Sequence, residues 1–260
     1  MRIIPQNIMK LSLKIFLIAF AMVIGGYSVV MAQQTAGVKV VAPKFKTIEI
    51  EVANSGICPI MYTYQDIVNS TASKALTKVR RSIYELTFGN YASPNAIDIR
   101  GAVEREAKAF RADFPKNSSE IIGSPYNRVT QKTSLLHNGK ILCVTNISLC
   151  NLGGRDIYSE RYYNFDLATG ELISFDYLED ARWLPQLRKL IYYKLSEWSQ
   201  NYVGTAEKIY IPTESIKITE RGLRLYFNPG NVGSNADGVI EVELTDKELS
   251  SLGVPLIWMK

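Results

Sequence analysis

The sequence predicts an α+β fold: an antiparallel sheet built from hairpins with helices packed on one face, and a smaller α/β part on the N-terminal side. Three observations lead to this class. The dipeptide Asn138-Gly139 lies between two strand-like segments, and it is the strongest short signal for a two-residue hairpin turn. A second hairpin is expected over 158–175, and an amphipathic helix after it. Such agreement between local signals is typical of a well-ordered domain.

The first 32 residues have the pattern of a secretory signal peptide. Three basic residues precede an apolar run over 15–30, and small residues end the segment before Gln33. We expect cleavage near Ala32. An uncleaved membrane anchor is the alternative, but the run is interrupted at 25–28 and is short for a membrane span. The mature protein is therefore expected in the periplasm or outside the cell, with the membrane contacted only through the signal segment.

Little net charge remains after that cleavage. The formal net charge is +5, and the removed segment holds three basic and no acidic residues, so the mature chain of 228 residues carries +2. This balance argues against nucleic acid as a partner. A chain of this length forms one large or two small domains. We assign 1–32 to the signal peptide, 33–115 to an N-terminal strand-helix-helix module and 120–260 to a C-terminal domain, with the polar run 116–119 between them.

The three cysteines are Cys58, Cys143 and Cys150. If 141–149 is one strand, Cys143 and Cys150 lie about 23 Å apart on opposite faces, and a disulfide needs Cα atoms within about 7 Å. A disulfide would therefore pair Cys58 with Cys143 or with Cys150, and both pairings remain open. The chain has one histidine and no close cysteine pair, which argues against a zinc site. No cofactor is expected.

The N-terminal module is expected to hold one strand and two helices. Alternation over 38–52 predicts the strand. Apolar residues at helical spacing predict a first helix over 72–86, with Gly89 at its C-terminal cap. A second helix is expected over 98–113, because Phe114-Pro115 disfavours its continuation.

In the first hairpin, His137 is expected opposite Lys140, and Leu135 opposite Leu142, because both residues of the Asn138-Gly139 turn would take positive φ. His137 is then a polar residue at a hairpin tip. A catalytic role would require a nucleophile or a carboxylate as its partner, and the sequence identifies none.

The second hairpin is expected to present Tyr163, Phe165 and Leu167 on one apolar face. Gly170 supplies the positive φ of its loop, and 172–175 is predicted as the returning strand. A turn is also expected at Gly153-Gly154, which lacks the spacing and the lysine of a phosphate loop.

A helix is expected to begin near Pro185, where the missing N–H costs nothing. Its apolar stripe consists of Leu184, Leu187, Ile191, Leu195 and Trp198, so the helix should lie across a sheet. Three acidic residues precede it: Asp176, Glu179 and Asp180. Adjacent carboxylates can divide acid and base roles. Capping of a helix start explains the same residues without catalysis, and we favour capping.

The C-terminal part alternates strands and turns. Strands are expected over 215–219, 223–227 and 239–244, with a turn at 220–222 and a loop over 228–238. Thr245 and Glu248 have the spacing of a capping box. They predict a short final helix that Gly253 ends.

Two stretches of the chain, RYYNFDLATGELISFDYLED and SIKITERGLRLYFNPGNVGSNADGVIEVELTDKEL, resemble the C-terminal domain of RsiV-like extracellular proteins. The resemblance covers about residues 140–252. It implies a secreted or membrane-tethered, non-catalytic envelope module, as in the lysozyme-sensing region of an anti-sigma factor or the accessory region of peptidoglycan deacetylases. The chain departs from the family at Arg155-Asp156, where a Gly-Gly-Ala-His turn is common, and at Gly230, where a tyrosine is common.

From these observations we expect a secreted or periplasmic module that binds peptidoglycan or a wall-directed protein such as lysozyme. Surface aromatics with polar neighbours suit sugar and protein contacts, and the candidates are Tyr158, Tyr162, Tyr192 and Tyr193. Tyrosines also pack at sheet edges with their hydroxyls in water. The alternatives are an envelope hydrolase or deacetylase-type enzyme with a carboxylate site, and a structural envelope protein. Candidate binding residues flank the second hairpin: Gly153, Gly154, Arg155, Asp156, Tyr158, Asn228 and Asn231.

Overall fold

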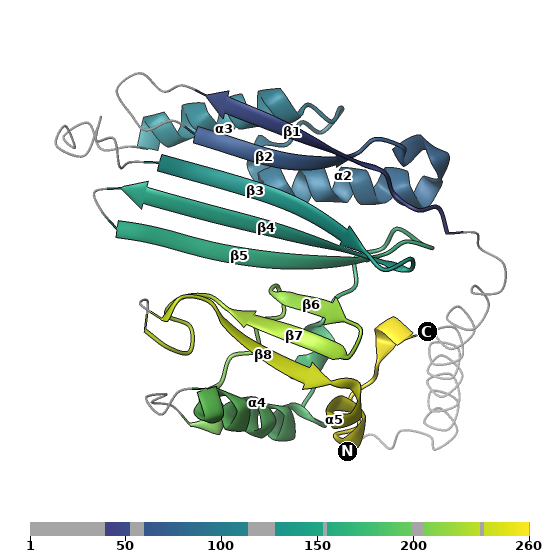
Figure 1. Ribbon diagram of the computed structural model, residues 1–260, viewed down its shortest axis with the longest axis vertical. Helices are drawn as coiled ribbons and strands as arrows, with labels where there is room; N and C mark the ends of the chain where they lie inside the picture. The colour runs from purple at the N-terminus through teal and green to yellow at the C-terminus, as the bar shows by residue number, and fades with distance from the viewer. Residues whose placement is uncertain are drawn as a thin grey trace, which may run out of the picture. The chain divides into compact units, whose positions relative to one another are not determined.

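Strands in the described part of the chain form two sheets, one of five strands and one of three (Figure 1). The computed structural model describes residues 40–52, 60–113, 128–152, 155–198, 205–234 and 237–259. Helices accompany both sheets, which confirms the predicted α+β class. The predicted signal peptide and Cys58 lie outside the described residues.

The five-stranded sheet has the order β1-β2-β3-β4-β5. Its strands are β1 (Phe45–Val52), β2 (Ile60–Ile67), β3 (Arg128–His137), β4 (Ile141–Leu152) and β5 (Arg155–Asp166). Neighbouring strands are antiparallel except β2 and β3, which are parallel. A parallel pair needs a crossover connection, and two helices lie between β2 and β3 in the chain. Strand β2 was not predicted from the sequence, although buried residues alternate with more exposed ones over 60–64.

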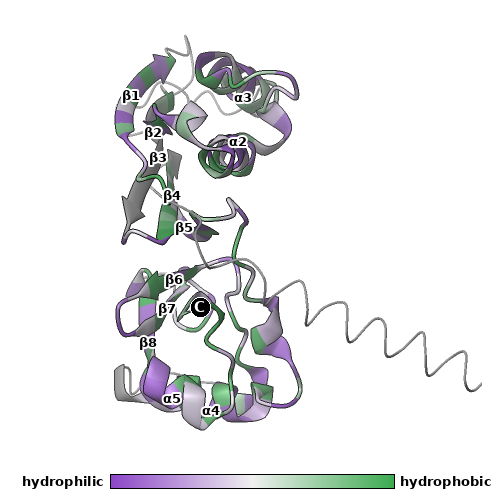
Figure 2. Ribbon diagram, turned by 90° about the vertical axis from the view of Figure 1, so that its right-hand side faces the viewer, coloured by the Kyte–Doolittle hydropathy of each residue, from purple (hydrophilic) through white to green (hydrophobic). Residues whose placement is uncertain are grey.

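Helices α2 (Lys74–Phe88) and α3 (Ile99–Asp113) lie on one side of β1, β2 and β3 (Figure 2). Tyr62 and Tyr64 of β2 pack against Phe88 of α2, with ring centroids 5.5 and 5.7 Å apart. Both predicted helices are confirmed within two residues at each end. Gly89 ends α2 with a φ of 49°, as expected for a C-terminal glycine. The Asp98 carboxylate begins α3 by accepting from the Gly101 N–H at 2.9 Å.

Polar groups buried under these helices are paired. The Arg80 guanidinium donates two hydrogen bonds, of 2.7 and 2.6 Å, to the buried carboxylate of Asp66, and this contact raises the pKa of Arg80. The Tyr62 hydroxyl donates to Glu106 of α3. Burial raises the pKa of Glu106, because desolvation disfavours the charged carboxylate.

The β3–β4 hairpin has a different register from the predicted one. His137 is paired with Leu142, and Leu135 with Val144. Among the turn residues only Gly139 has a positive φ, of 92°. The Asn138 carboxamide oxygen accepts from the Ile141 N–H at 2.9 Å, so Asn138 opens the turn and does not occupy its centre. The predicted partners of His137 and Leu135, which were Lys140 and Leu142, were therefore wrong: each true partner lies two residues further along the chain.

The chain leaves β5 without forming the predicted strand over 172–175. Only Leu172 bridges back to Phe165, and the Ile173 N–H donates to the Asn164 carbonyl at 2.7 Å. Gly170, with a φ of 76°, lies against α2: a Cβ there would be 2.6 Å from the Ala75 carbonyl oxygen. Because this loop docks on a helix, the chain turns away from β5 and the returning strand is lost.

The three-stranded sheet is antiparallel, in the order β6-β7-β8. Its strands are β6 (Ile216–Thr219), β7 (Gly222–Phe227) and β8 (Ile240–Thr245), each within one residue of its predicted bounds. The predicted capping box is also confirmed. The Glu248 N–H donates to the Thr245 hydroxyl, and the Thr245 N–H donates to the Glu248 carboxylate at 2.8 Å. These bonds begin α5 (Asp246–Ser251).

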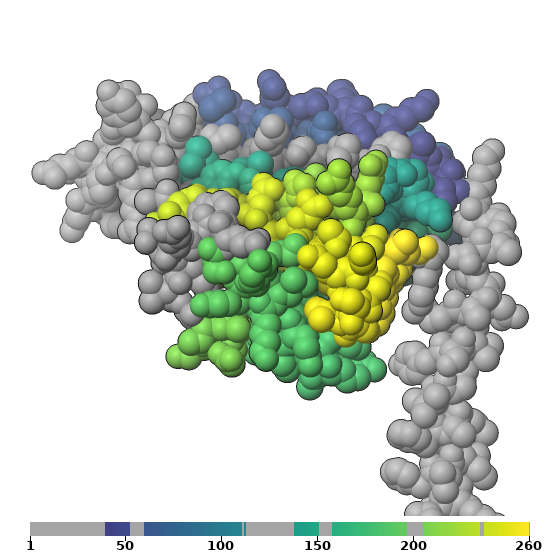
Figure 3. All heavy atoms as spheres, turned by 60° about the horizontal axis from the view of Figure 1, so that its bottom comes forward, coloured from purple at the N-terminus to yellow at the C-terminus, as the bar shows by residue number. Residues whose placement is uncertain are grey.

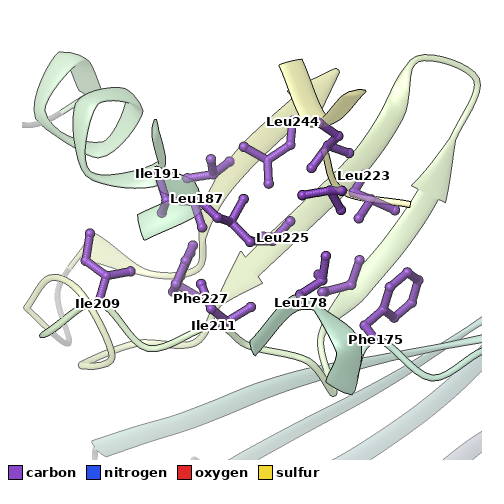
Figure 4. Packing of buried hydrophobic residues seen from close by; sticks show 14 of the residues in the cluster. Phe175, Leu178, Leu187, Ile191, Ile209, Ile211, Leu223, Leu225, Phe227 and Leu244 are labelled. Carbon is purple, nitrogen blue, oxygen red and sulfur yellow. The ribbon is translucent and has the colours of Figure 1, made fainter. Parts of the chain in front are cut away.

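Helix α4 (Leu184–Trp198) packs on this second sheet. Leu187 and Ile191 from α4 lie beside Leu225 and Phe227 of β7 (Figure 4). The predicted apolar stripe is therefore confirmed at Leu187, Ile191 and Leu195, which are buried. Lys194 of α4 forms an ion pair of 2.8 Å with Glu248 of α5, and α4 and the C-terminal segment occupy the same face in Figure 3.

The more apolar face predicted for the second hairpin is buried at Phe165 and Leu167, and the opposite face is buried as well. Tyr162 and Asn164 on that other face are 8% and 1% exposed. The three-stranded sheet covers that other face, because Tyr226 of β7 stacks on Tyr162. Strands from both sides of 116–119 share the five-stranded sheet. The run itself lies outside the described residues, and the division into two domains stays a prediction.

Cys143 is a buried free thiol in β4, so its pairing with Cys58 was wrong. The pairing of Cys58 with Cys150 stays a prediction, because Cys58 lies outside the described residues. Cys143 and Cys150 share β4 as expected. Burial raises the pKa of Cys143 from 9.0 to about 11.

We expect Cys143 to react with a maleimide or with iodoacetamide at pH 8 roughly 100-fold more slowly in the folded protein than in urea, since the thiolate is the reactive form. Peptide mass spectrometry after timed labelling measures this rate, and Cys143→Ala supplies the control. Equal labelling of Cys143 in the folded and unfolded protein would contradict burial of this thiol.

Candidate functional site

Strand β5 and the three-stranded sheet are joined mainly by side chains. One parallel bridge links Tyr162 to Ser215, with the Tyr162 N–H donating to the Glu214 carbonyl at 3.2 Å. The Asn164 carboxamide donates to the Ile216 carbonyl at 2.6 Å and accepts from the Ile218 N–H at 3.0 Å. The Asn164 side chain therefore takes the place of a strand partner for the backbone of β6, where unpaired backbone groups would otherwise be costly.

Asn228, which follows β7, makes the reciprocal contact. Its carboxamide accepts from the Glu160 N–H at 2.8 Å and donates to the Glu160 carbonyl at 3.1 Å. The Ser215 hydroxyl donates to the same carbonyl at 3.0 Å. The backbone of Glu160 is thus fixed by side chains from two other segments.

The carboxylate of Glu160 accepts hydrogen bonds from two tyrosines of the same strand. Tyr162 donates to one oxygen at 2.7 Å, and Tyr158 donates to the other. The ring of Tyr162 stacks on Tyr226, with centroids 3.9 Å apart and an interplanar angle of 18°. We call Tyr158, Glu160, Tyr162, Tyr226 and Asn228 the Glu160 cluster. Burial, and then the hydrogen bond to Glu160, raise the pKa of Tyr158 and of Tyr162, so both phenols stay protonated donors.

The position of the cluster follows from strand register. Tyr62 and Tyr64 of β2 face α2, whereas Met61 is 48% exposed. Met61 of β2 is paired with a residue of β3, that residue is paired with one of β4, and the latter is paired with Tyr158 of β5. Directly paired residues share a face of the sheet. The Glu160 cluster therefore lies on the face opposite α2 and α3.

Charged residues of the three-stranded sheet lie beside this cluster. Arg224 of β7 donates to Glu241 and to Glu243 of β8, both at 3.3 Å. Burial and the charge of Glu241 raise the pKa of Tyr226. The acidic groups of β8 thus have a cation of their own.

The structure brings together some of the predicted binding residues. Tyr158 and Asn228 both contact Glu160, and the exposed Asn231 donates its N–H to the Asn228 carbonyl at 3.0 Å. The backbones of Arg155 and Asp156 begin β5. The side chains of these two residues, together with Gly153 and Gly154, lie outside the described part of the chain.

Sequence reasoning missed Glu160 and Tyr226, and it named Tyr162 only as one of four surface aromatics. The signal for Glu160 was present, because Tyr158, Glu160 and Tyr162 alternate along one strand and must share a face. Tyr226 lies on another strand, and only the packing of the two sheets brings it to Tyr162.

Of the acidic residues before α4, Asp180 is the one whose carboxylate has a hydrogen bond to the backbone in the described structure, and that bond closes the turn ahead of the helix. Asp180 accepts from the Arg182 N–H and pairs with the Arg182 guanidinium, each at 2.9 Å. The hydrogen bonds from Arg182 lower the pKa of Asp180, the opposite of what a general acid needs. Asp176 and Glu179 are exposed. Among the described residues no three His, Cys, Asp or Glu side chains gather to hold a metal ion.

No helix in the part of the chain that the structure describes is long and apolar enough to cross a membrane. A comparison with the curated proteins finds no match. Residues 177–247 match the family model described as a protein of unknown function, DUF3298. This segment holds α4 and all three strands of the second sheet.

Two solved structures of DUF3298 proteins resemble the fold. The one from Bacteroides fragilis has a TM-score of 0.62 at 19% identity, covering 81% of this chain and 93% of its own. The one from Pseudomonas aeruginosa has a TM-score of 0.55 at 11% identity, covering 81% of this chain and 94% of its own. These likenesses establish a shared fold. Residues 177–247 thus match the DUF3298 family model, and the chain shares the fold of these two solved DUF3298 proteins.

Proposed function

We propose that this protein is a non-catalytic binding module of the bacterial cell envelope and that its ligand is peptidoglycan. The N-terminal segment has the pattern of a secretory signal, which supports a place outside the inner membrane. The resemblance to RsiV-like extracellular domains also supports a location outside the inner membrane. The domain match carries no stated activity, so the proposal depends on the chemistry of the site.

The Glu160 cluster is the observation that carries the proposal. It combines phenol, carboxylate and carboxamide groups from β5 and from the segment after β7, held by the hydrogen bonds given above. Tyr158, Glu160 and Asn228 are each half-buried, so each also meets solvent. Rigid aromatic rings beside polar donors and acceptors suit ligands that are rich in hydroxyl and amide groups. Peptidoglycan presents both, in its sugars and in its peptides.

Sedimentation with purified sacculi tests the proposal. The full chain is expected to co-sediment, and Tyr158→Ser is expected to weaken binding roughly 10-fold, because a contact tyrosine near the centre of an interface carries much of the binding energy. Tyr193→Ser is the matched control, since Tyr193 is a 60% exposed tyrosine on α4. Circular dichroism shows that each variant keeps its fold.

The remaining outcomes decide between functions. Retention on immobilised lysozyme but not on sacculi would move the function to a protein partner. Retention on neither would contradict the proposal. A hydrolase would release soluble fragments from the sacculi, and Asp176→Asn with Asp180→Asn would abolish that release if those carboxylates carried it.

A further inference from the structure

We propose that Glu160 is the binding site for a primary ammonium group of the ligand, namely the free side-chain amino group of a peptidoglycan stem peptide. This inference rests on the proposed function and assigns the chemical group that the Glu160 cluster recognises. It follows from the charge, the hydrogen bonding and the exposure of one carboxylate.

Glu160 differs from three other buried or partly buried carboxylates in the charge of its hydrogen-bond partners, and in this respect it resembles Glu106, which accepts from the Tyr62 hydroxyl. Asp66 pairs with Arg80, Glu248 with Lys194 and Glu243 with Arg224. The hydrogen bonds to the Glu160 carboxylate come from tyrosines, and none of the ion pairs among the described residues includes it. Because tyrosine hydroxyls are neutral, their hydrogen bonds do not balance the negative charge of the Glu160 carboxylate.

The Glu160 carboxylate is also held in place before any ligand arrives. One tyrosine hydroxyl holds each of its oxygens, and Asn228 and Ser215 hold its backbone. Binding to a fixed group avoids the entropy cost of ordering a side chain. An ionised carboxylate has about four acceptor positions. The two tyrosines use two of them and leave the others for a ligand.

The surrounding groups favour an ammonium ion as the ligand. An ammonium carries three donors and no acceptor, so it complements a carboxylate whose neighbours already donate to it. Tyr158 and Tyr162 lie on either side of Glu160 along β5, about 7 Å away at strand rise. Their rings can add cation–π attraction. Arg224, the cation of the adjacent β7, contacts Tyr226 of the cluster, but its ion pairs are with Glu241 and Glu243 and not with Glu160.

Chemical acetylation of the sacculi tests this inference without any change to the protein. Acetic anhydride converts free amino groups into neutral amides. We expect the affinity of the wild-type chain to fall roughly 10-fold on acetylated sacculi, as for the loss of one charge-assisted hydrogen bond. Glu160→Gln should bind native sacculi as weakly as the wild type binds acetylated sacculi, and acetylation should not weaken it further.

Glu241→Gln is the matched control, because Glu241 is an exposed carboxylate of the neighbouring sheet that already pairs with Arg224. This variant should keep the full difference between native and acetylated sacculi. Equal wild-type binding to both preparations would overturn the ammonium site and leave peptidoglycan binding standing. No binding to native sacculi would overturn the proposed function and the inference with it. The wild-type comparison decides the matter even if Glu160→Gln fails to fold.

Discussion

Replacing Gly222 by alanine is expected to lower the free energy of unfolding by about 3–5 kcal/mol, the sum of backbone strain and overpacking. Gly222 begins β7 with a φ of 147°. A Cβ there would lie 2.1 Å from the Leu244 carbonyl oxygen and 2.9 Å from the Asp246 nitrogen. Both atoms are backbone, and the Asp246 N–H donates to the Arg221 carbonyl at 2.8 Å. The β8–α5 junction therefore cannot move aside without losing this bond.

Urea denaturation measures this effect, and Gly238→Ala separates its two causes. Gly238 also has a positive φ, of 72°, but an added Cβ would meet nothing within 4 Å. We expect that variant to cost about 1–2 kcal/mol, from the backbone conformation alone. A similar loss in both variants would show that the contact with the Leu244 carbonyl is relieved by relaxation.

Replacing Asn164 by alanine is expected to cost about 2–5 kcal/mol, because it leaves one buried carbonyl and one buried N–H without partners. Asn164 is 1% exposed, and the residues that carry those groups, Ile216 and Ile218, are 0% and 7% exposed. Water cannot readily replace the lost bonds at such a position. The change should weaken the attachment of the three-stranded sheet to β5.

Asn228→Ala is the comparison for that result. Its carboxamide makes the same two kinds of bond to β5, but the residue is only half-buried. Water can then compensate, and we expect a loss of about 1 kcal/mol or less. Thermal unfolding followed by circular dichroism measures both variants. If Asn164→Ala were no more destabilising than Asn228→Ala, the junction would not depend on the burial of its hydrogen bonds.

Most local elements were predictable from the sequence because their signals lie within a few residues of one another. Gly89 ends α2, and Thr245 with Glu248 begins α5, through contacts that span at most four residues. The apolar stripe of α4 was equally readable, since helical spacing shows which side is buried. The sequence did not show which sheet that side meets.

The errors in the predicted elements have both distant and local causes. The expected strand over 172–175 is absent because Gly170 docks against Ala75, far back in the chain. The register of the β3–β4 hairpin changed because the Asn138 carboxamide takes over a backbone hydrogen bond. Strand β2 has a readable alternation, but its parallel pairing with β3 depends on a crossover through two helices.

The candidate site divides in the same way. The sequence by itself determined that Tyr158, Glu160 and Tyr162 share one face of a strand, since side chains alternate along β-structure. It also determined that Asn228 begins a loop after a strand. Only the tertiary structure decided that this loop reaches β5, that Tyr226 stacks on Tyr162, and that the Glu160 carboxylate accepts from hydroxyl groups and forms no ion pair with the described residues. The physical reason is that β5 and β7 are far apart in sequence. Their contact is set by how two sheets bury their edges and faces together, which no short stretch of residues records.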